Sequence, residues 1–82
     1  MILYGSRARG DAGKESDWDF LILMDSPVTT IQKQLIRHSL YKIEWQMGEV
    51  ISSIIESKNN WNAPIMRATP FYKRVKKEGI RV

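Results

Sequence analysis

A run of apolar residues, Phe20–Met24, constrains the fold of this 82-residue chain more than any other feature. The stretch DWDF alternates polar and apolar residues, and FLILM that follows is apolar throughout until Asp25. A strand at the edge of a core alternates, whereas a central strand reads as a continuous apolar run. The sequence therefore predicts a central strand of a sheet at this point.

Patterns on either side of this run predict further elements. The apolar residues 1–4 indicate a short buried strand. Apolar residues at roughly helical spacing predict a helix over about 29–46, with Ser26 or Thr29 as its cap and Gly48 at its end. Between these elements, residues 8–16 predict a loop with one helical turn at its start.

The second half of the chain continues the sheet. The β-branched stretch 49–57 predicts a third strand, and 58–64 predicts a loop. A proline at position 70 and a glycine at position 79 indicate the two ends of a short helix. Residues 80–82 can form a last edge strand.

The order of these elements predicts a small α/β or α+β fold. We expect one domain, 1–82, in which a mixed sheet carries helices packed on one face. The first strand starts at residue 1, so apolar surface beside it would lie uncovered. An N-terminal helix, a homodimer or a partner protein would cover that surface.

Composition narrows the class of protein. The chain has no cysteine, which excludes disulfides and thiolate metal sites, and it is 43% hydrophobic and 27% charged, as ordinary folded proteins are. No apolar run approaches the roughly 18–20 residues that cross a bilayer, and no leader peptide is visible, so we expect a cytoplasmic protein without membrane association. The net charge is +4.

The charges are unevenly distributed along the chain. Acids gather in 11–25 and bases in 67–82. The basic segment is interpreted as a solvated helix face in preference to a patch that faces phosphates or a partner. Phe71 and Tyr72 lie among these bases, but one helix offers little surface for RNA, so nucleic acid is not the expected partner.

Asp17 and Asp19 are the first candidates for chemistry. On a strand, residues i and i+2 point to the same face, about 6.5–7 Å apart. Two carboxylates this close repel each other unless a cation or hydrogen-bond donors lie between them. Mg²⁺ prefers such oxygen ligands and often binds one or two carboxylates together with the phosphates of a substrate.

Gly5 and Ser6 are the second candidates. Glycine lets a backbone approach a phosphate closely, and serine offers both its amide and its hydroxyl. If Arg7 to Arg9 begin a helical turn, its free amides would attract an anion, and both arginines could add charge-assisted hydrogen bonds. The loop would then hold a triphosphate at one end and the bridging metal at the other.

Together, the stretches GSRARG and SDWDFLIL resemble the minimal nucleotidyltransferases of the DNA polymerase β-like superfamily. Their signature is Gly-Ser-x-Ala-Arg-Gly, a short spacer, then Ser-Asp-x-Asp before apolar residues. The matching positions here are Gly5, Ser6, Ala8, Arg9, Gly10, Ser16, Asp17 and Asp19. The resemblance extends to the C-terminal TPFYKRVKKEGIRV, which is similar to the closing helix of many such proteins.

This resemblance implies a catalytic domain that transfers a nucleoside monophosphate from a nucleoside triphosphate, with AMP from ATP expected. It implies that Asp17 and Asp19 hold two Mg²⁺ ions, which clamp the attacking and leaving oxygens. The triphosphate would lie on Gly5 and Ser6, with support from Arg9 and Ser16. Many relatives act as antitoxins of a HEPN-domain partner protein, some by attaching AMP to it.

The sequence departs from the family in two ways. A third carboxylate, expected on the strand 49–57, falls at Ser52, and Glu44, Glu49 or Glu56 could replace it only if the register shifts. The helix that usually precedes the Gly-Ser strand is absent from this sequence. The alternative to an enzyme is therefore a catalytically inactive, antitoxin-like binding module that keeps the fold.

Overall fold

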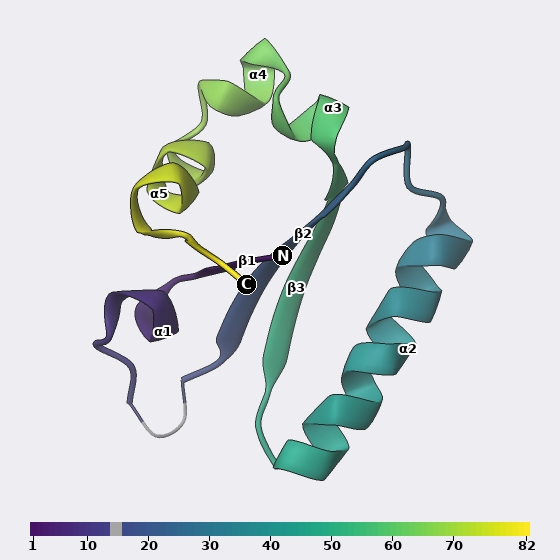
Figure 1. Cartoon of the computed structure of the whole chain (residues 1–82), viewed down its shortest axis with the longest axis vertical. Coiled ribbons are helices and arrows are strands. Elements are labelled where there is room, and N and C mark those ends of the chain that lie inside the picture. The colour runs from purple at the N-terminus through teal and green to yellow at the C-terminus, as the bar shows by residue number, and fades with distance from the viewer. Residues whose placement is uncertain (14–15) are drawn as a thin grey trace.

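Four strands form one mixed sheet in the order β3-β2-β1-β4 (Figure 1). The computed structural model describes residues 1–13 and 16–82. Strand β1 pairs antiparallel with both β2 and β4, while β3 pairs parallel with β2. The strands are β1 (Ile2–Tyr4), β2 (Trp18–Met24), β3 (Ile51–Ser57) and β4 (Ile80–Arg81). The predicted α+β fold and the central position of the apolar strand are confirmed.

Helix α2 (Thr30–Met47) connects the two parallel strands β2 and β3. A parallel pair needs such a crossover, because a tight turn cannot return the chain in the same direction. Thr29 begins the helix with a capping box, in which its side chain and that of Gln32 accept from each other's backbone amides. Gly48 ends it in the left-handed conformation, with φ of 69°. Of the two predicted caps, Thr29 is the one used.

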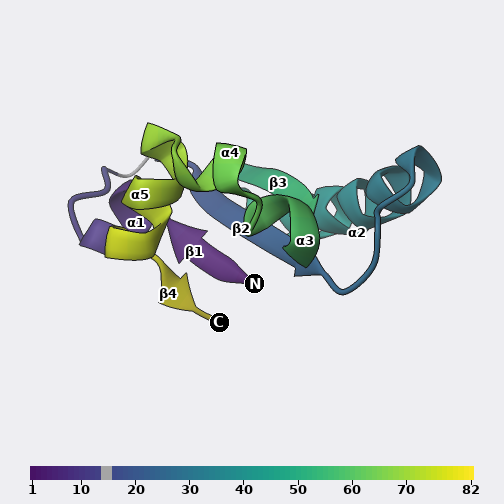
Figure 2. The same cartoon turned by 90° about the horizontal axis from the view of Figure 1, so that it is seen from above.

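The core lies between the sheet and the helices that follow β3. These helices are α3 (Lys58–Trp61), α4 (Pro64–Arg67) and α5 (Pro70–Glu78), and they lie above one face of the sheet in Figure 2. Leu21 of β2 is fully buried there against Trp61, Tyr72 and Val75. The short helix α1 (Ser6–Arg9), which follows β1, is the helical turn predicted at the start of the loop 8–16; residues 14 and 15 of that loop lie outside the described part of the chain.

The prediction of a loop over 58–64 is wrong. The segment forms α3 and enters α4. The reason is capping: the buried Ser57 hydroxyl accepts from the Asn60 amide, which fixes the first turn of α3. Pro64 then occupies the first position of α4, where its missing N–H costs nothing.

The other face of the sheet carries apolar side chains that are only partly covered. Helix α2 lies beside β3, and none of its residues is buried. Its Trp45 is 86% exposed. A hollow of about 240 Å³ between α2 and this face is lined by Met1, Trp18, Phe20, Leu40, Ile43, Met47 and Ile51. Apolar side chains on this side of the described structure are therefore open to solvent.

Among the described residues, no helix combines the length and the apolar character that crossing a bilayer requires.

Candidate active site

Asp17, Asp19 and Ser52 meet where β2 and β3 begin. Asp19 lies in β2 directly opposite Ser52 of β3 and opposite Tyr4 of β1. The Ser52 hydroxyl donates a hydrogen bond to Oδ2 of Asp17 at 3.2 Å. Parallel strands that start at the same level bring these distant positions together. Ser52 thus occupies the place beside the aspartates where the family resemblance expects a third carboxylate.

The two aspartates are in an unfavourable electrostatic environment when both are ionised. Burial raises the pKa of Asp19, and the negative charge of Asp17 raises it further, while the positive charge of Arg9 partly offsets both effects. The pKa of Tyr4 is also raised, first by burial and then by the charge of Asp19. A cation placed between the carboxylates would relieve this repulsion.

The oxygen atoms of this site are of the kind that Mg²⁺ prefers, and they would fill part of its coordination shell. Two carboxylates and a serine hydroxyl are hard oxygen donors, and Mg²⁺ commonly takes its remaining ligands from water and substrate phosphates. In the described ranges 1–13 and 16–82, no three acidic or histidine side chains are grouped closely enough to hold a metal by themselves. The chain's own residues therefore fit a metal that arrives with a nucleotide.

Gly5 lies directly against the Asp19 carboxylate. A Cβ atom on Gly5 would collide with Oδ2 of Asp19, and its backbone angles, φ 77° and ψ −159°, belong to a region that is essentially restricted to glycine. The Gly5 carbonyl accepts from the amides of Ala8 and Arg9 and so begins helix α1. The Gly-Ser turn and the aspartates are therefore neighbours in space, with Ser6 as the first residue of the helix.

Arg9 is held in ion pairs on the outer side of α1. Its guanidinium binds Asp11 at 3.1 Å and Glu78 of α5 at 3.0 Å. These contacts connect the front of the chain to its last helix. The sequence predicts Arg9 as support for either the loop or the phosphates, and these ion pairs correspond to the first of those roles.

Arg7, which the sequence offers with Arg9 as a donor of charge-assisted hydrogen bonds to phosphate, binds groups of the protein itself. Its Nη2 donates to the Ser16 carbonyl at 3.0 Å, and its guanidinium lies 4.6 Å from the ring centroid of Trp18. Its Nη2 also lies 3.8 Å from Glu49. Within the described part of the chain, its Nε is buried without a partner. Arg7 thus joins helix α1 to the start of β2.

Ser16 forms a turn within the loop itself. Its hydroxyl accepts from the Gly13 amide at 2.9 Å, and its own amide donates to the Gly13 carbonyl at 3.2 Å. The Ser16 side chain is thus bonded to the backbone of its own loop.

The three glutamates that could replace the third carboxylate lie elsewhere. Glu44 accepts from the Ile51 amide at 2.8 Å, and Glu49 accepts from the indole of Trp18 at 2.7 Å. Glu56 shares the face of Ser52, as alternation predicts, but it lies four residues farther along β3, about 13 Å away. In the described structure, none of these three glutamates therefore contacts Asp17 or Asp19.

The Gly-Ser turn therefore lies beside Asp19 of β2, and Asp17 directly precedes that strand. The sequence model of the family described as nucleotidyltransferase domain matches residues 1–81. The chain belongs to this family, whose members transfer nucleoside monophosphates.

Two relatives from Methanocaldococcus jannaschii are similar over much of the chain, and both carry the name "putative protein adenylyltransferase". One is 35% identical over 79 residues, which cover 96% of this chain and 72% of the relative. The other is 41% identical over 58 residues, which cover 71% of this chain and 59% of the relative, so the match spans less than two thirds of that protein. No solved structure matches the chain.

Proposed function

We propose that this chain is a magnesium-dependent nucleotidyltransferase domain that transfers AMP from ATP to a hydroxyl group of an acceptor protein. The observation that carries the proposal is the contact between Gly5 and the Asp19 carboxylate. Because of this contact, a phosphate bound at the Gly-Ser turn would lie beside a metal ion bound by the carboxylates. The names of the two relatives support a protein acceptor and an adenylyl donor.

In this proposal, Asp17 and Asp19 hold Mg²⁺ and the backbone at Gly5 and Ser6 receives the triphosphate. When bound, the metal would supply charge neutralisation on the phosphate oxygens. The acceptor oxygen forms a bond to the α-phosphorus, the bond from that phosphorus to the bridging oxygen breaks, and pyrophosphate leaves. The hydroxyl proton passes to solvent. Arg7, Arg9 and Ser16 keep the loop in place.

We propose a HEPN-domain protein as the acceptor, with the two proteins forming a toxin-antitoxin pair. The pair would act in the cytoplasm, where ATP is available. Support for a protein partner comes from the apolar side of α2, where Trp45 is 86% exposed and Ile31 is 68% exposed. A homodimer over the same surface is the competing assembly, and measurement of mass in solution with and without the partner separates the two.

Ser52 supports a second candidate function, an antitoxin-like module that binds nucleotide and partner without catalysis. A serine cannot supply the negative charge of a third metal ligand. Its hydroxyl is already engaged with Asp17. The module and the enzyme share the fold and the nucleotide site, so only transfer activity distinguishes them.

The first experiment is calorimetric titration of ATP, with and without Mg²⁺, into the wild type and the double variant Asp17→Asn/Asp19→Asn. Asp25→Asn is the matched control, because this exposed carboxylate binds Lys58 beyond the far end of β2. We expect magnesium-dependent binding in the wild type and the control and none in the double variant.

Radiolabelled ATP, incubated with the partner protein, then tests transfer. Label on the partner that requires both aspartates supports the enzyme. Binding without label supports the module. A folded wild type that does not bind ATP at all contradicts both functions.

A further inference from the structure

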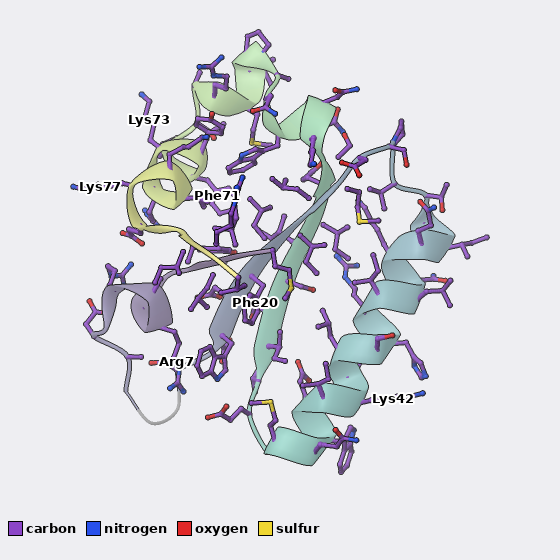
Figure 3. All side chains as sticks on the ribbon, in the orientation of Figure 1. Arg7, Phe20, Lys42, Phe71, Lys73 and Lys77 are labelled. Atoms are coloured by element: carbon purple, nitrogen blue, oxygen red, sulfur yellow. The ribbon has the colours of Figure 1, made fainter. Side chains whose placement is uncertain are left out.

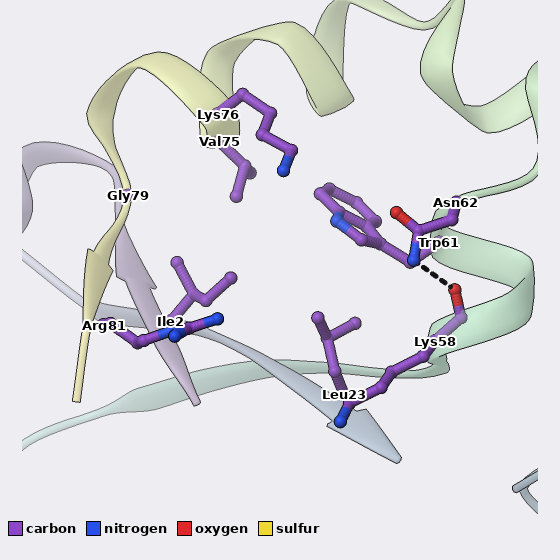
Figure 4. Close-up of a pocket in the computed structure, with 9 residues that line it drawn as sticks. All are labelled: Ile2, Leu23, Lys58, Trp61, Asn62, Val75, Lys76, Gly79 and Arg81. Carbon is purple, nitrogen blue, oxygen red and sulfur yellow. Dashed lines mark hydrogen bonds between the residues drawn. The ribbon is translucent and has the colours of Figure 1, made fainter. Parts of the chain in front are cut away.

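A hollow of about 440 Å³ opens on the helix-covered face of the sheet (Figure 4). Its base is apolar and is formed by Ile2, Leu23, Val75 and Trp61. This volume lies within the range of small-ligand sites, about 300–1,000 Å³. The sequence reasoning does not single out a site here.

Three cations from three different elements surround this hollow: Lys58 of α3, Lys76 of α5 and Arg81 of β4. Arg81 lies opposite Ile2 in the sheet, so its side chain points to the same face as Ile2. Figure 4 shows the Lys76 side chain reaching into the space above the base. Its ammonium lies 5.6 Å from the ring centroid of Tyr72, a contact that favours this direction.

The positive charge in the hollow is only partly balanced. Lys58 pairs with Asp25 at 2.6 Å. Within ranges 1–13 and 16–82, no carboxylate forms an ion pair with Lys76 or Arg81. An anion bound in the hollow would balance the positive charges of Lys76 and Arg81.

The backbone holds these cations in place. At Gly79, a Cβ atom would lie 2.6 Å from Cγ2 of Ile2 and 2.5 Å from the Val75 carbonyl. Only glycine therefore lets the chain pass so tightly from α5 into β4. This turn carries Lys76 and Arg81 to the same hollow.

The hollow is separate from the aspartate pair. In the antiparallel register, Tyr4 lies opposite Asp19, whereas Ile2 lies opposite Leu21. The hollow is at the Ile2 end of β1, and the fully buried Leu21 lies between the two places. Binding in the hollow should therefore not require the aspartates.

We propose that this hollow is a second ligand site, which binds a small amphipathic anion. The ligand carries one carboxylate or phosphate monoester attached to an apolar or aromatic group. Lys76 and Arg81 form charge-assisted hydrogen bonds with the anion, and the apolar base contacts the rest of the ligand. The amide of Asn62, on the same rim, is a further polar contact.

The test is an NMR titration of the ¹⁵N-labelled full chain, followed at the Trp61 indole and the Gly79 amide. The probes are N-acetylphenylalanine for the carboxylate and phenyl phosphate for the phosphate monoester. N-acetylphenylalanine amide is the control compound without a negative charge. Inorganic phosphate is the control compound without an apolar group. We expect saturable chemical-shift changes with at least one of the two probes. The affinities of the two control compounds should be at least about tenfold weaker.

Substitutions of the cations that line the hollow test whether the probes bind there. Lys76→Gln and Arg81→Gln should each weaken binding about tenfold, since each removes a charge-assisted hydrogen bond. Lys77→Gln is the matched control, because Lys77 is adjacent in α5 but points away from the hollow in Figure 3. All three side chains are exposed, so the variants should fold. Asp17→Asn/Asp19→Asn should bind both probes as the wild type does.

The outcomes separate the two ligand chemistries. Binding of one probe alone identifies the anion as carboxylate or phosphate, and binding of both identifies a general anion site. The proposal is overturned if neither probe saturates, if the neutral amide binds equally well, or if Lys77→Gln weakens binding as much as Lys76→Gln does.

Discussion

Asp19 should reduce the stability of the protein at neutral pH when no metal is bound. Its pKa is raised by burial and by the charge of Asp17. A carboxylate whose pKa is higher in the folded than in the unfolded state favours folding when protonated and opposes it when ionised. Stability should therefore fall as pH rises through the folded-state pKa of Asp19, and Asp19→Asn should remove this loss.

The part of this effect that comes from the charge of Asp17 follows from the spacing of the pair. Asp17 directly precedes β2, and residues i and i+2 of an extended chain lie about 6.5–7 Å apart. Two unit charges at that separation repel by about 0.6 kcal/mol in bulk water and by about 2.5 kcal/mol at an effective dielectric constant near 20. Because Asp17 is exposed and Asp19 is half-buried, the lower part of the range applies, about 1 kcal/mol.

The assay is thermal unfolding followed by circular dichroism, without Mg²⁺, at low and high salt. For a domain of this size, about 1 kcal/mol corresponds to a rise in Tm of about 4–8 °C. We expect Asp19→Asn to show this rise at pH 7, to lose most of it near pH 3, and to show less of it in high salt. The pKa of Tyr4 should fall in the same variant, because the charge of Asp19 contributes to raising it.

Asp25→Asn is the control with the opposite sign. A hydrogen bond from Lys58 lowers the pKa of Asp25, so its ionised form favours folding above its unfolded-state pKa. Its replacement should lower Tm slightly at pH 7. A lower Tm for Asp19→Asn at pH 7, or a Tm difference from the wild type that does not depend on pH, would refute the reasoning, because the carboxylate would then be held by favourable contacts.

Three further predictions concern the site and its support. Gly5→Ala should destabilise the fold by about 1–3 kcal/mol through its backbone angles, and it should also abolish ATP binding because the new methyl group displaces Asp19; urea unfolding and calorimetry measure the two effects, and unchanged ATP affinity would contradict the placement of the turn. Ser52→Asp should lower Tm without Mg²⁺ and make Tm depend more steeply on added Mg²⁺ than in the wild type, since a third carboxylate joins the pair; an unchanged metal response would show that Ser52 lies outside the metal site. Trp61→Ala should destabilise the protein by about 3–5 kcal/mol in urea unfolding, because its indole is 3% exposed and packs against the core; a loss under about 1 kcal/mol would mean that α3 does not close the core.

The uneven success of the sequence predictions has a physical reason. The helix 30–47 and the helix 70–78 were predictable because their end signals act within one or two turns of chain. These signals are the caps Thr29 and Gly48, and Pro70 at the first position of α5. The short helices α3 and α4 were not predicted, because their start depends on a single serine hydroxyl and one proline in a stretch rich in polar residues.

The site shows the same division between local and long-range information. The sequence by itself determined the Gly-Ser turn and the close spacing of Asp17 and Asp19, since residues i and i+2 are neighbours in any extended chain. The predicted strand begins one residue later than expected, so Asp17 directly precedes β2. The structure shows that the chain after Gly5 forms the helical turn that the sequence reasoning considered.

Only the tertiary structure decided which residues stand beside the aspartates. The parallel register of β2 and β3 puts Ser52 next to Asp19 and leaves Glu56 about 13 Å away. The fold brings Glu78 of α5 to Arg9 of α1, although the two residues are 69 positions apart in the chain. The hollow with Lys76 and Arg81 likewise forms only when α5 and β4 return to the sheet. Pairing between distant segments depends on the whole fold, because no local pattern specifies which strand becomes the neighbour of another.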